Sequence, residues 1–109
     1  MIKTKLFSAA SSLLALCMLS FSAQAQDLNL GRTKAATACA VCHGPMGMAM
    51  QPGVPHLAGQ PQIYLAEQLK HYRSGKRPHE VMAVIAKTLT DADIEALSHW
   101  YASIAIKLE

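Results

Sequence analysis

One short motif, Cys39-Ala40-Val41-Cys42-His43, limits the possible folds of this chain more than any other feature. Two thiols at this spacing, with a histidine directly after the second, can bind zinc, cycle between dithiol and disulfide, or hold a c-type haem. In the third case the thiols add across the two vinyl groups of the porphyrin, and the histidine becomes an axial ligand of the iron. The spacing suits haem because one turn brings both sulfurs to the same porphyrin edge and leaves the next side chain above the iron. The surrounding sequence decides between the three chemistries.

The N-terminal segment has the three parts of a secretory signal peptide. Lys3 and Lys5 form a basic start, residues 6–21 are mostly apolar and uncharged, and Ala23-Gln24-Ala25 supplies the small residues that a signal peptidase accepts. A membrane-spanning anchor is the alternative, but serines and glutamines dilute both ends of the uncharged run. We therefore predict cleavage after Ala25.

This cleavage sets the domain organisation: residues 1–25 are a signal peptide, and residues 26–109 form one small domain. Cys17 leaves with the signal peptide, because Leu16 stands where lipoprotein processing requires a small residue. The mature chain keeps only the two motif thiols, as expected in an oxidising compartment such as the bacterial periplasm. No membrane span remains after cleavage.

The charge and size of the mature chain exclude one partner class and favour a prosthetic group. Removal of two lysines brings the basic residues close in number to the seven Asp and Glu, so a nucleic-acid partner has no support. A chain this short has difficulty building a sufficient core from side chains alone. A porphyrin offers a large apolar disc on which short helices can pack, so we expect folding to be coupled to the cofactor.

The mature domain is predicted to be all-α, without strand patterns or repeats. Apolar residues at helical spacing predict helices over residues 28–39, from Pro61 to Gly75, from Glu80 to Leu89, and from the Thr90 N-cap to about Lys107. Glycines and prolines between residues 44 and 59 predict an ordered loop of turns instead of a helix or strand.

The chain resembles the small monohaem class I cytochromes c of bacterial periplasmic type, over nearly the whole mature chain and in order. The stretches that carry the resemblance are the motif with Gly44, then Pro55-His56-Leu57-Ala58-Gly59-Gln60, Tyr64-Leu65, Gln68-Leu69, Arg73-Ser74-Gly75-Lys76-Arg77, Met82 and Leu89-Thr90-Asp91-Ala92-Asp93-Ile94. The resemblance implies a cytochrome c fold, in which short helices wrap around one covalently bound haem. It also implies that the first and last helices cross, with Gly31 and the Trp100/Tyr101 pair placed at the crossing.

The same resemblance implies the site residues. Cys39 and Cys42 would hold one haem c covalently, and His43 would be one axial ligand of the iron. Met82 would be the other axial ligand, and the carbonyl of Pro55 would accept the Nδ1–H of His43. Such a bond fixes the tautomer and the ring orientation of a metal-bound histidine.

Other residues stay open as the second axial ligand. Met46 follows His43 too closely to pass round the porphyrin easily, whereas a loop could carry Met48 or Met50 across. Met82 could also simply fill a gap in the core. Among the remaining histidines, His56 in the proline-rich loop is the strongest alternative, and we expect His71, His79 and His99 to be solvated or partly exposed. A bis-histidine site would have a lower reduction potential than a His/Met site.

A basic cluster (Lys70, Arg73, Lys76 and Arg77) begins in the last turns of the second predicted helix and continues just beyond it. It indicates either a solvated helix end or a docking face for an acidic redox partner. Redox complexes of this kind are small and short-lived, so we expect transient contacts with a donor protein and an acceptor protein.

The sequence therefore predicts a periplasmic electron carrier and not an enzyme, because full axial ligation leaves no open position on the iron. A cytochrome subunit fixed to a periplasmic dehydrogenase is the alternative. A zinc-binding or thiol-redox module built on Cys39 and Cys42 is a third hypothesis. It lacks the second ligand pair of a zinc site and the strand-flanked setting of a redox dithiol.

Overall fold

The structure is a computed structural model that describes residues 23–107, and it contains helices and loops but no strand within that range. Residues 23–38 are helical, and four further helices follow: α2 (Ala40–His43), α3 (Gln62–Ser74), α4 (Glu80–Lys87) and α5 (Asp91–Ser103). The all-α prediction is confirmed. The predicted signal peptide lies mostly outside the described residues. None of the helices within residues 23–107 is long and apolar enough to cross a membrane.

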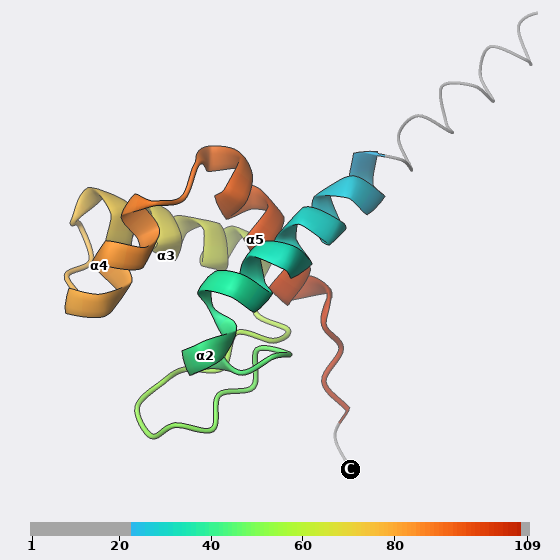
Figure 1. Cartoon of the computed structure of the whole chain (residues 1–109), viewed down its shortest axis with the longest axis horizontal. Helices are drawn as coiled ribbons and strands as arrows, with labels where there is room; N and C mark the ends of the chain where they lie inside the picture. The colour runs from blue at the N-terminus through green and yellow to red at the C-terminus, as the bar shows by residue number, and fades with distance from the viewer. Residues whose placement is uncertain (1–22, 108–109) are drawn as a thin grey trace, which may run out of the picture.

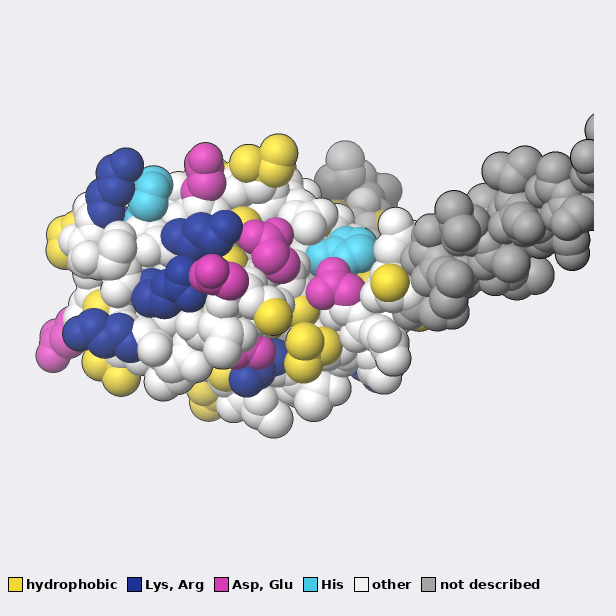
Figure 2. All heavy atoms as spheres, turned by 90° about the horizontal axis from the view of Figure 1, so that it is seen from above, with side chains coloured by type: hydrophobic (Ala, Val, Ile, Leu, Met, Phe, Trp, Pro, Cys, Tyr) yellow, Lys and Arg dark blue, Asp and Glu magenta, His cyan; other side chains and the backbone are white. Residues whose placement is uncertain are grey.

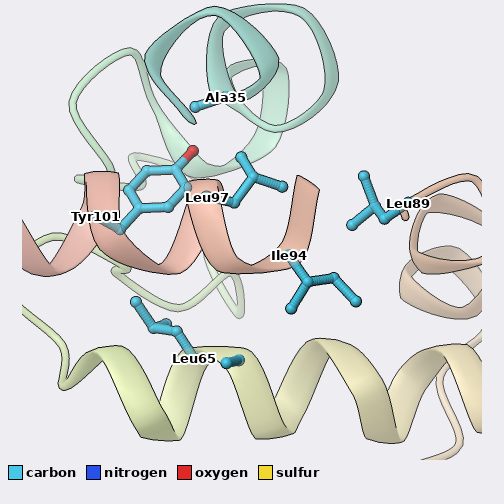
Figure 3. Close-up of a cluster of buried hydrophobic side chains, with 7 residues drawn as sticks. Ala35, Leu65, Leu89, Ile94, Leu97 and Tyr101 are labelled. Carbon is cyan, nitrogen blue, oxygen red and sulfur yellow. The ribbon is translucent and has the colours of Figure 1, made fainter. Parts of the chain in front are cut away.

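The helices form three layers around one small core. α5 lies between the helical segment of residues 23–38 on one side and α3 on the other, and α4 packs at the end of α3 (Figure 1, Figure 3). The buried cluster consists of Ala35, Leu65, Ala66, Leu89, Ile94, Leu97 and Tyr101. Ile94 and Leu97 of α5 are almost wholly buried, as expected for the central layer. α5 is therefore the element on which the first helical segment and α3 pack, whereas α4 packs on α3.

A glycine permits the close crossing between the first helical segment and α5. Gly31 is buried, and a Cβ atom added to it would lie 2.1 Å from the carbonyl oxygen of Ala96 and 2.8 Å from Cβ of Trp100. No real side chain fits at such distances, so only glycine lets the two backbones approach this closely. The predicted crossing at Gly31 and Trp100 is confirmed.

Local sequence signals explain where α3 begins and ends and where α5 begins. Pro61 directly precedes α3, and Gly75 ends it in the left-handed conformation with φ of 84°. Thr90 caps α5 in a reciprocal pair: its Oγ1 accepts the N–H of Asp93 at 3.1 Å, and Asp93 Oδ2 accepts the N–H of Thr90 at 3.0 Å. Asp93 also lies 3.3 Å from Nζ of Lys34, so the cap connects α5 to the first helical segment.

Three predicted helix boundaries are wrong. The first helical segment extends back at least to residue 23 instead of beginning at Leu28, and α4 ends at Lys87, two residues before Leu89. α5 ends at Ser103 and not near Lys107. The carbonyl of Tyr101, which would accept the N–H of Ala105 in a longer α5, instead accepts the N–H of Ile104 at 3.3 Å and the N–H of Gly59 at 2.9 Å. The loop therefore ends the last helix, and residues 104–107 leave it as non-helical chain.

The crossing at Gly31 predicts the sign of a substitution. In an exposed helix Gly31→Ala would raise the free energy of unfolding by about 1 kcal/mol. Here we expect a loss of about 1–3 kcal/mol, because the added methyl group overlaps the backbone of α5. Denaturant unfolding of the full chain, followed by circular dichroism, measures the difference. Arg32→Ala, at the exposed neighbouring position, is the control and should change it by less than about 0.5 kcal/mol. A gain for Gly31→Ala would contradict the crossing.

The α5 cap predicts a pH dependence. The backbone N–H of Thr90 lowers the pKa of Asp93, and the Thr90 side chain and Lys34 act in the same direction against the opposing effect of burial. Stability from this carboxylate is therefore present above its pKa in the unfolded chain, about 3.9, and is lost as the pH falls through the lower folded-state pKa. We expect the free energy of unfolding to fall less between pH 5 and pH 2 in Asp93→Asn than in the wild type. Glu67→Gln, which removes an exposed carboxylate from α3, should keep the wild-type slope.

Candidate functional site

The motif lies where the first helical segment gives way to α2. The N–H of Cys39 donates to the carbonyl of Ala35 at 3.0 Å, and the N–H groups of Cys42 and His43 both donate to the carbonyl of Cys39, at 3.2 Å and 2.9 Å. The two cysteines are therefore joined by one helical turn. Both are free and partly buried. One helical turn presents both sulfurs to a single flat group, as covalent haem attachment requires.

The imidazole of His43 is buried and held by the loop of residues 44–61. Its Nδ1 lies 2.9 Å from the carbonyl oxygen of Pro55. A carbonyl can only accept, so Nδ1 carries the hydrogen and Nε2 keeps its lone pair. A ring fixed in this tautomer can offer Nε2 to a metal ion. Pro55, the residue predicted to orient His43, is therefore in contact with it.

Gly47 holds this loop against α5. Its carbonyl accepts the N–H groups of Leu57 at 2.8 Å and Ala58 at 3.1 Å. Gly47 has φ of 73°, and a Cβ atom added to it would lie 2.8 Å from both the nitrogen of Ala58 and Cδ1 of Tyr101. The left-handed backbone and the close approach both require glycine here. Tyr101 therefore supports the loop that carries Pro55.

The thiol of Cys39 has an environment unlike that of a redox-active cysteine. Burial raises the pKa of this thiol, and the neighbouring Tyr101 hydroxyl offsets the rise only in part. A reactive dithiol instead needs a cysteine whose pKa is lowered by positive charge or a helix N-terminus. The thiol-redox hypothesis therefore has no support at Cys39.

The donor set also fails to fit zinc. No group of three or more His, Cys, Asp or Glu side chains within residues 23–107 is arranged to hold a metal ion. A structural zinc site takes four such ligands. Two thiols on one turn, with an oriented histidine next to them, instead match the covalent and axial contacts of a c-type haem.

Two buried polar atoms of α5 have no hydrogen-bond partner among the described residues. They are the Tyr101 hydroxyl and Nε1 of Trp100. Tyr101 is directed toward the first helical segment, near Ala35 (Figure 3). Its pKa is raised, first by burial and then by the neighbouring Cys39. Sequence reasoning placed Tyr101 at the helix crossing but missed its contact with the motif cysteine.

The predicted second axial ligand lies on a separate element. Met82 is partly buried in the first turn of α4, which packs against α3. In the loop after the motif, Met46 and Met48 are about half exposed, and Met50 is 95% exposed. The loop methionines are extensively exposed, Met50 above all. This exposure does not support any of them as a ligand enclosed by the protein. Met82 stays the prediction for the axial ligand.

Three of the other histidines use a ring nitrogen in a contact of their own. Nδ1 of His56 accepts the N–H of Ala49 at 2.9 Å, and Nδ1 of His79 accepts the N–H of Met82 at 3.1 Å. Nδ1 of His99 lies 2.7 Å from Oδ2 of Asp27. His56, the strongest alternative ligand in the sequence, thus helps to hold the loop.

The basic cluster is largely paired within the chain. Lys70 contacts Glu95 at 3.1 Å, and Arg73 contacts both Asp91 and the carbonyl of Leu89. Figure 2 shows basic and acidic side chains next to one another on this face. Arg77 donates to Gln68 at 2.8 Å. These contacts tie α3 to its neighbours, but Lys70, Lys76 and Arg77 stay exposed, so the docking face stays a prediction.

Comparison with known proteins gives a family match over most of the chain. The family model for cytochrome c matches residues 28–105. One relative, named thiosulfate dehydrogenase electron acceptor, from Stutzerimonas stutzeri, is 38% identical over an alignment of 72 residues, and the match covers 63% of this chain and 33% of the relative. The chain therefore spans about a third of the length of that relative.

Solved structures agree with the sequence match. The crystal structure of reduced cytochrome c4 from Pseudomonas stutzeri superposes with a TM-score of 0.67 at 30% identity, over 73% of this chain and 49% of that one. A thiosulfate dehydrogenase from Marichromatium purpuratum gives a TM-score of 0.65 at 35% identity, over 72% of this chain and 19% of that one.

Proposed function

The chain belongs to the cytochrome c family, and from that membership we propose that it carries single electrons between protein partners on one haem c. The observation that carries the proposal is the buried His43 ring, whose Nδ1 lies 2.9 Å from the Pro55 carbonyl and whose Nε2 is left to bind iron. When bound, the haem supplies an iron that alternates between the ferrous and ferric states.

The chain's own residues attach, orient and enclose this group. Cys39 and Cys42 would hold it through two thioether bonds, and His43 would bind the iron through Nε2. Met82 of α4, on a different element from the motif, would be the second protein ligand. A thioether and an imidazole as ligands give a higher reduction potential than two imidazoles. Two protein ligands would leave no iron position for a substrate, so the proposed role is transfer and not catalysis.

A second role is favoured by the comparisons: a cytochrome subunit or electron acceptor of a periplasmic dehydrogenase. A relative is named as the electron acceptor of thiosulfate dehydrogenase, and a solved thiosulfate dehydrogenase contains a domain similar to this chain. Stable co-purification with a catalytic subunit identifies the fixed subunit, whereas a free carrier exchanges electrons in short-lived encounters.

We place this activity in the periplasm, after cleavage of residues 1–25. The matched family region, residues 28–105, falls inside the proposed mature domain of residues 26–109. Free Cys39 and Cys42 are the thiols that haem attachment would consume, which suits export to an oxidising compartment.

Substitution of the proposed axial methionine tests this function. The oxidised wild type should show the weak deep-red band of sulfur–iron ligation, and a redox titration should follow a single one-electron curve. We expect Met82→Ala to lose the deep-red band and to have a lower reduction potential, because the thioether is gone. Met48→Ala and Met50→Ala are matched controls in the exposed loop and should keep the band. A band that survives in Met82→Ala and disappears in a loop variant would move the ligand to the loop.

A further inference from the structure

His79 occupies the N-cap position of α4, the helix that carries Met82. Its backbone is extended, with φ of −165° and ψ of 124°, and its Nδ1 accepts the N–H of Met82 at 3.1 Å. The first N–H groups of a helix have no partner inside the helix, and a side chain at the N-cap usually satisfies one of them. Here the satisfied N–H belongs to the proposed axial ligand itself. The position of Met82 is therefore tied to the imidazole of His79.

The imidazole of His79 is in turn positioned by α3. The ring packs edge-on against Tyr72, with centroids 5.9 Å apart and ring planes at 78°. Tyr72 is buried in the last turns of α3. Edge-to-face contacts of this kind favour one relative orientation of the two rings.

Arg77 covers the same tyrosine and fastens the chain between α3 and α4. Its guanidinium carbon lies 4.8 Å from the centroid of Tyr72, and its Nη1 donates to Gln68 at 2.8 Å. Its backbone N–H donates to the carbonyl of His71 at 3.1 Å. A planar guanidinium can stack on a ring and donate in its own plane at once, which an ammonium cannot do. The chain that leads from α3 to His79 is thus held at several points.

From these contacts we infer that His79 is a positioning residue for Met82. It fixes the first turn of α4, so that the methionine side chain is presented to the haem iron instead of relaxing away from it. Arg77 packs on Tyr72 of α3, and Tyr72 packs on the ring of His79. His79 in turn accepts the backbone N–H of Met82. This inference rests on the proposed function, because it requires Met82 to be an axial ligand.

Competition by added imidazole tests the inference on the haem-loaded protein. Imidazole displaces a weakly held methionine from the iron, and the loss of the deep-red band reports the displacement at fixed pH. We expect His79→Ala to need about threefold to tenfold less imidazole than the wild type, the range expected for loss of a helix cap. His79→Asn, whose amide oxygen can also cap, should return to within about twofold of the wild type.

A matched control separates positioning from general loss of stability. Thr90 caps α5 as His79 caps α4, with Oγ1 3.1 Å from the nitrogen of Asp93, and α5 carries no proposed ligand. Thr90→Ala should lower the unfolding midpoint but leave the imidazole requirement within about twofold of the wild type. Equal imidazole requirements for His79→Ala and Thr90→Ala would overturn the inference, and so would failure of His79→Asn to restore the wild-type value.

The Met82→Ala spectrum distinguishes failure of this inference from failure of the proposed function. If Met82→Ala loses the deep-red band and His79→Ala binds imidazole as the wild type does, Met82 is the ligand and His79 does not position it. If the band survives in Met82→Ala, the ligand assignment itself is wrong, and the inference about His79 falls with it.

Discussion

The contact between His43 and Pro55 is the interaction on which the rest of the site depends. It joins the end of the motif to a loop that contains little regular structure, and it selects the tautomer that leaves Nε2 free. The loop keeps its shape because Gly47 accepts two backbone bonds and packs on Tyr101. Unlike a side chain, the backbone carbonyl of Pro55 cannot change rotamer or ionise. His43 therefore keeps the same partner at any pH.

α5 connects this site to the core. One face of α5 meets the first helical segment at Gly31, and the other packs on α3 (Figure 3). Tyr101 belongs to the buried cluster and also contacts Cys39 and Gly47. Because the motif cysteine and the loop both contact Tyr101, a change in the packing of α5 would displace both the proposed thioether and the histidine. In a domain of this size, the same residues form the core and support the site.

Local signals predicted the elements, and tertiary contacts decided what the sequence could not. Pro61, Gly75 and Thr90 mark helix ends through their own backbone chemistry, so α3 and the start of α5 were predicted correctly. The end of α5 was not, because the carbonyl of Tyr101 pairs with Gly59 from a distant loop. The contact between His43 and Pro55 was predicted from the resemblance to the family. His79 is exposed, as predicted. The contacts of Arg77 with Tyr72 and of His79 with Met82 were not predicted, because they form only when α3 and α4 are packed, although the spacing from His79 to Met82 is that of an N-cap.

Covalent attachment of one haem by Cys39 and Cys42 is tested most directly by the mass of the purified protein. The full chain is produced in a bacterial host that attaches c-type haem. The protein is then denatured and extracted with acidified organic solvent, and its molecular mass is measured. We expect a mass equal to residues 26–109 plus one haem, with the colour remaining on the polypeptide. A colourless polypeptide, or haem that leaves with the solvent, would contradict it.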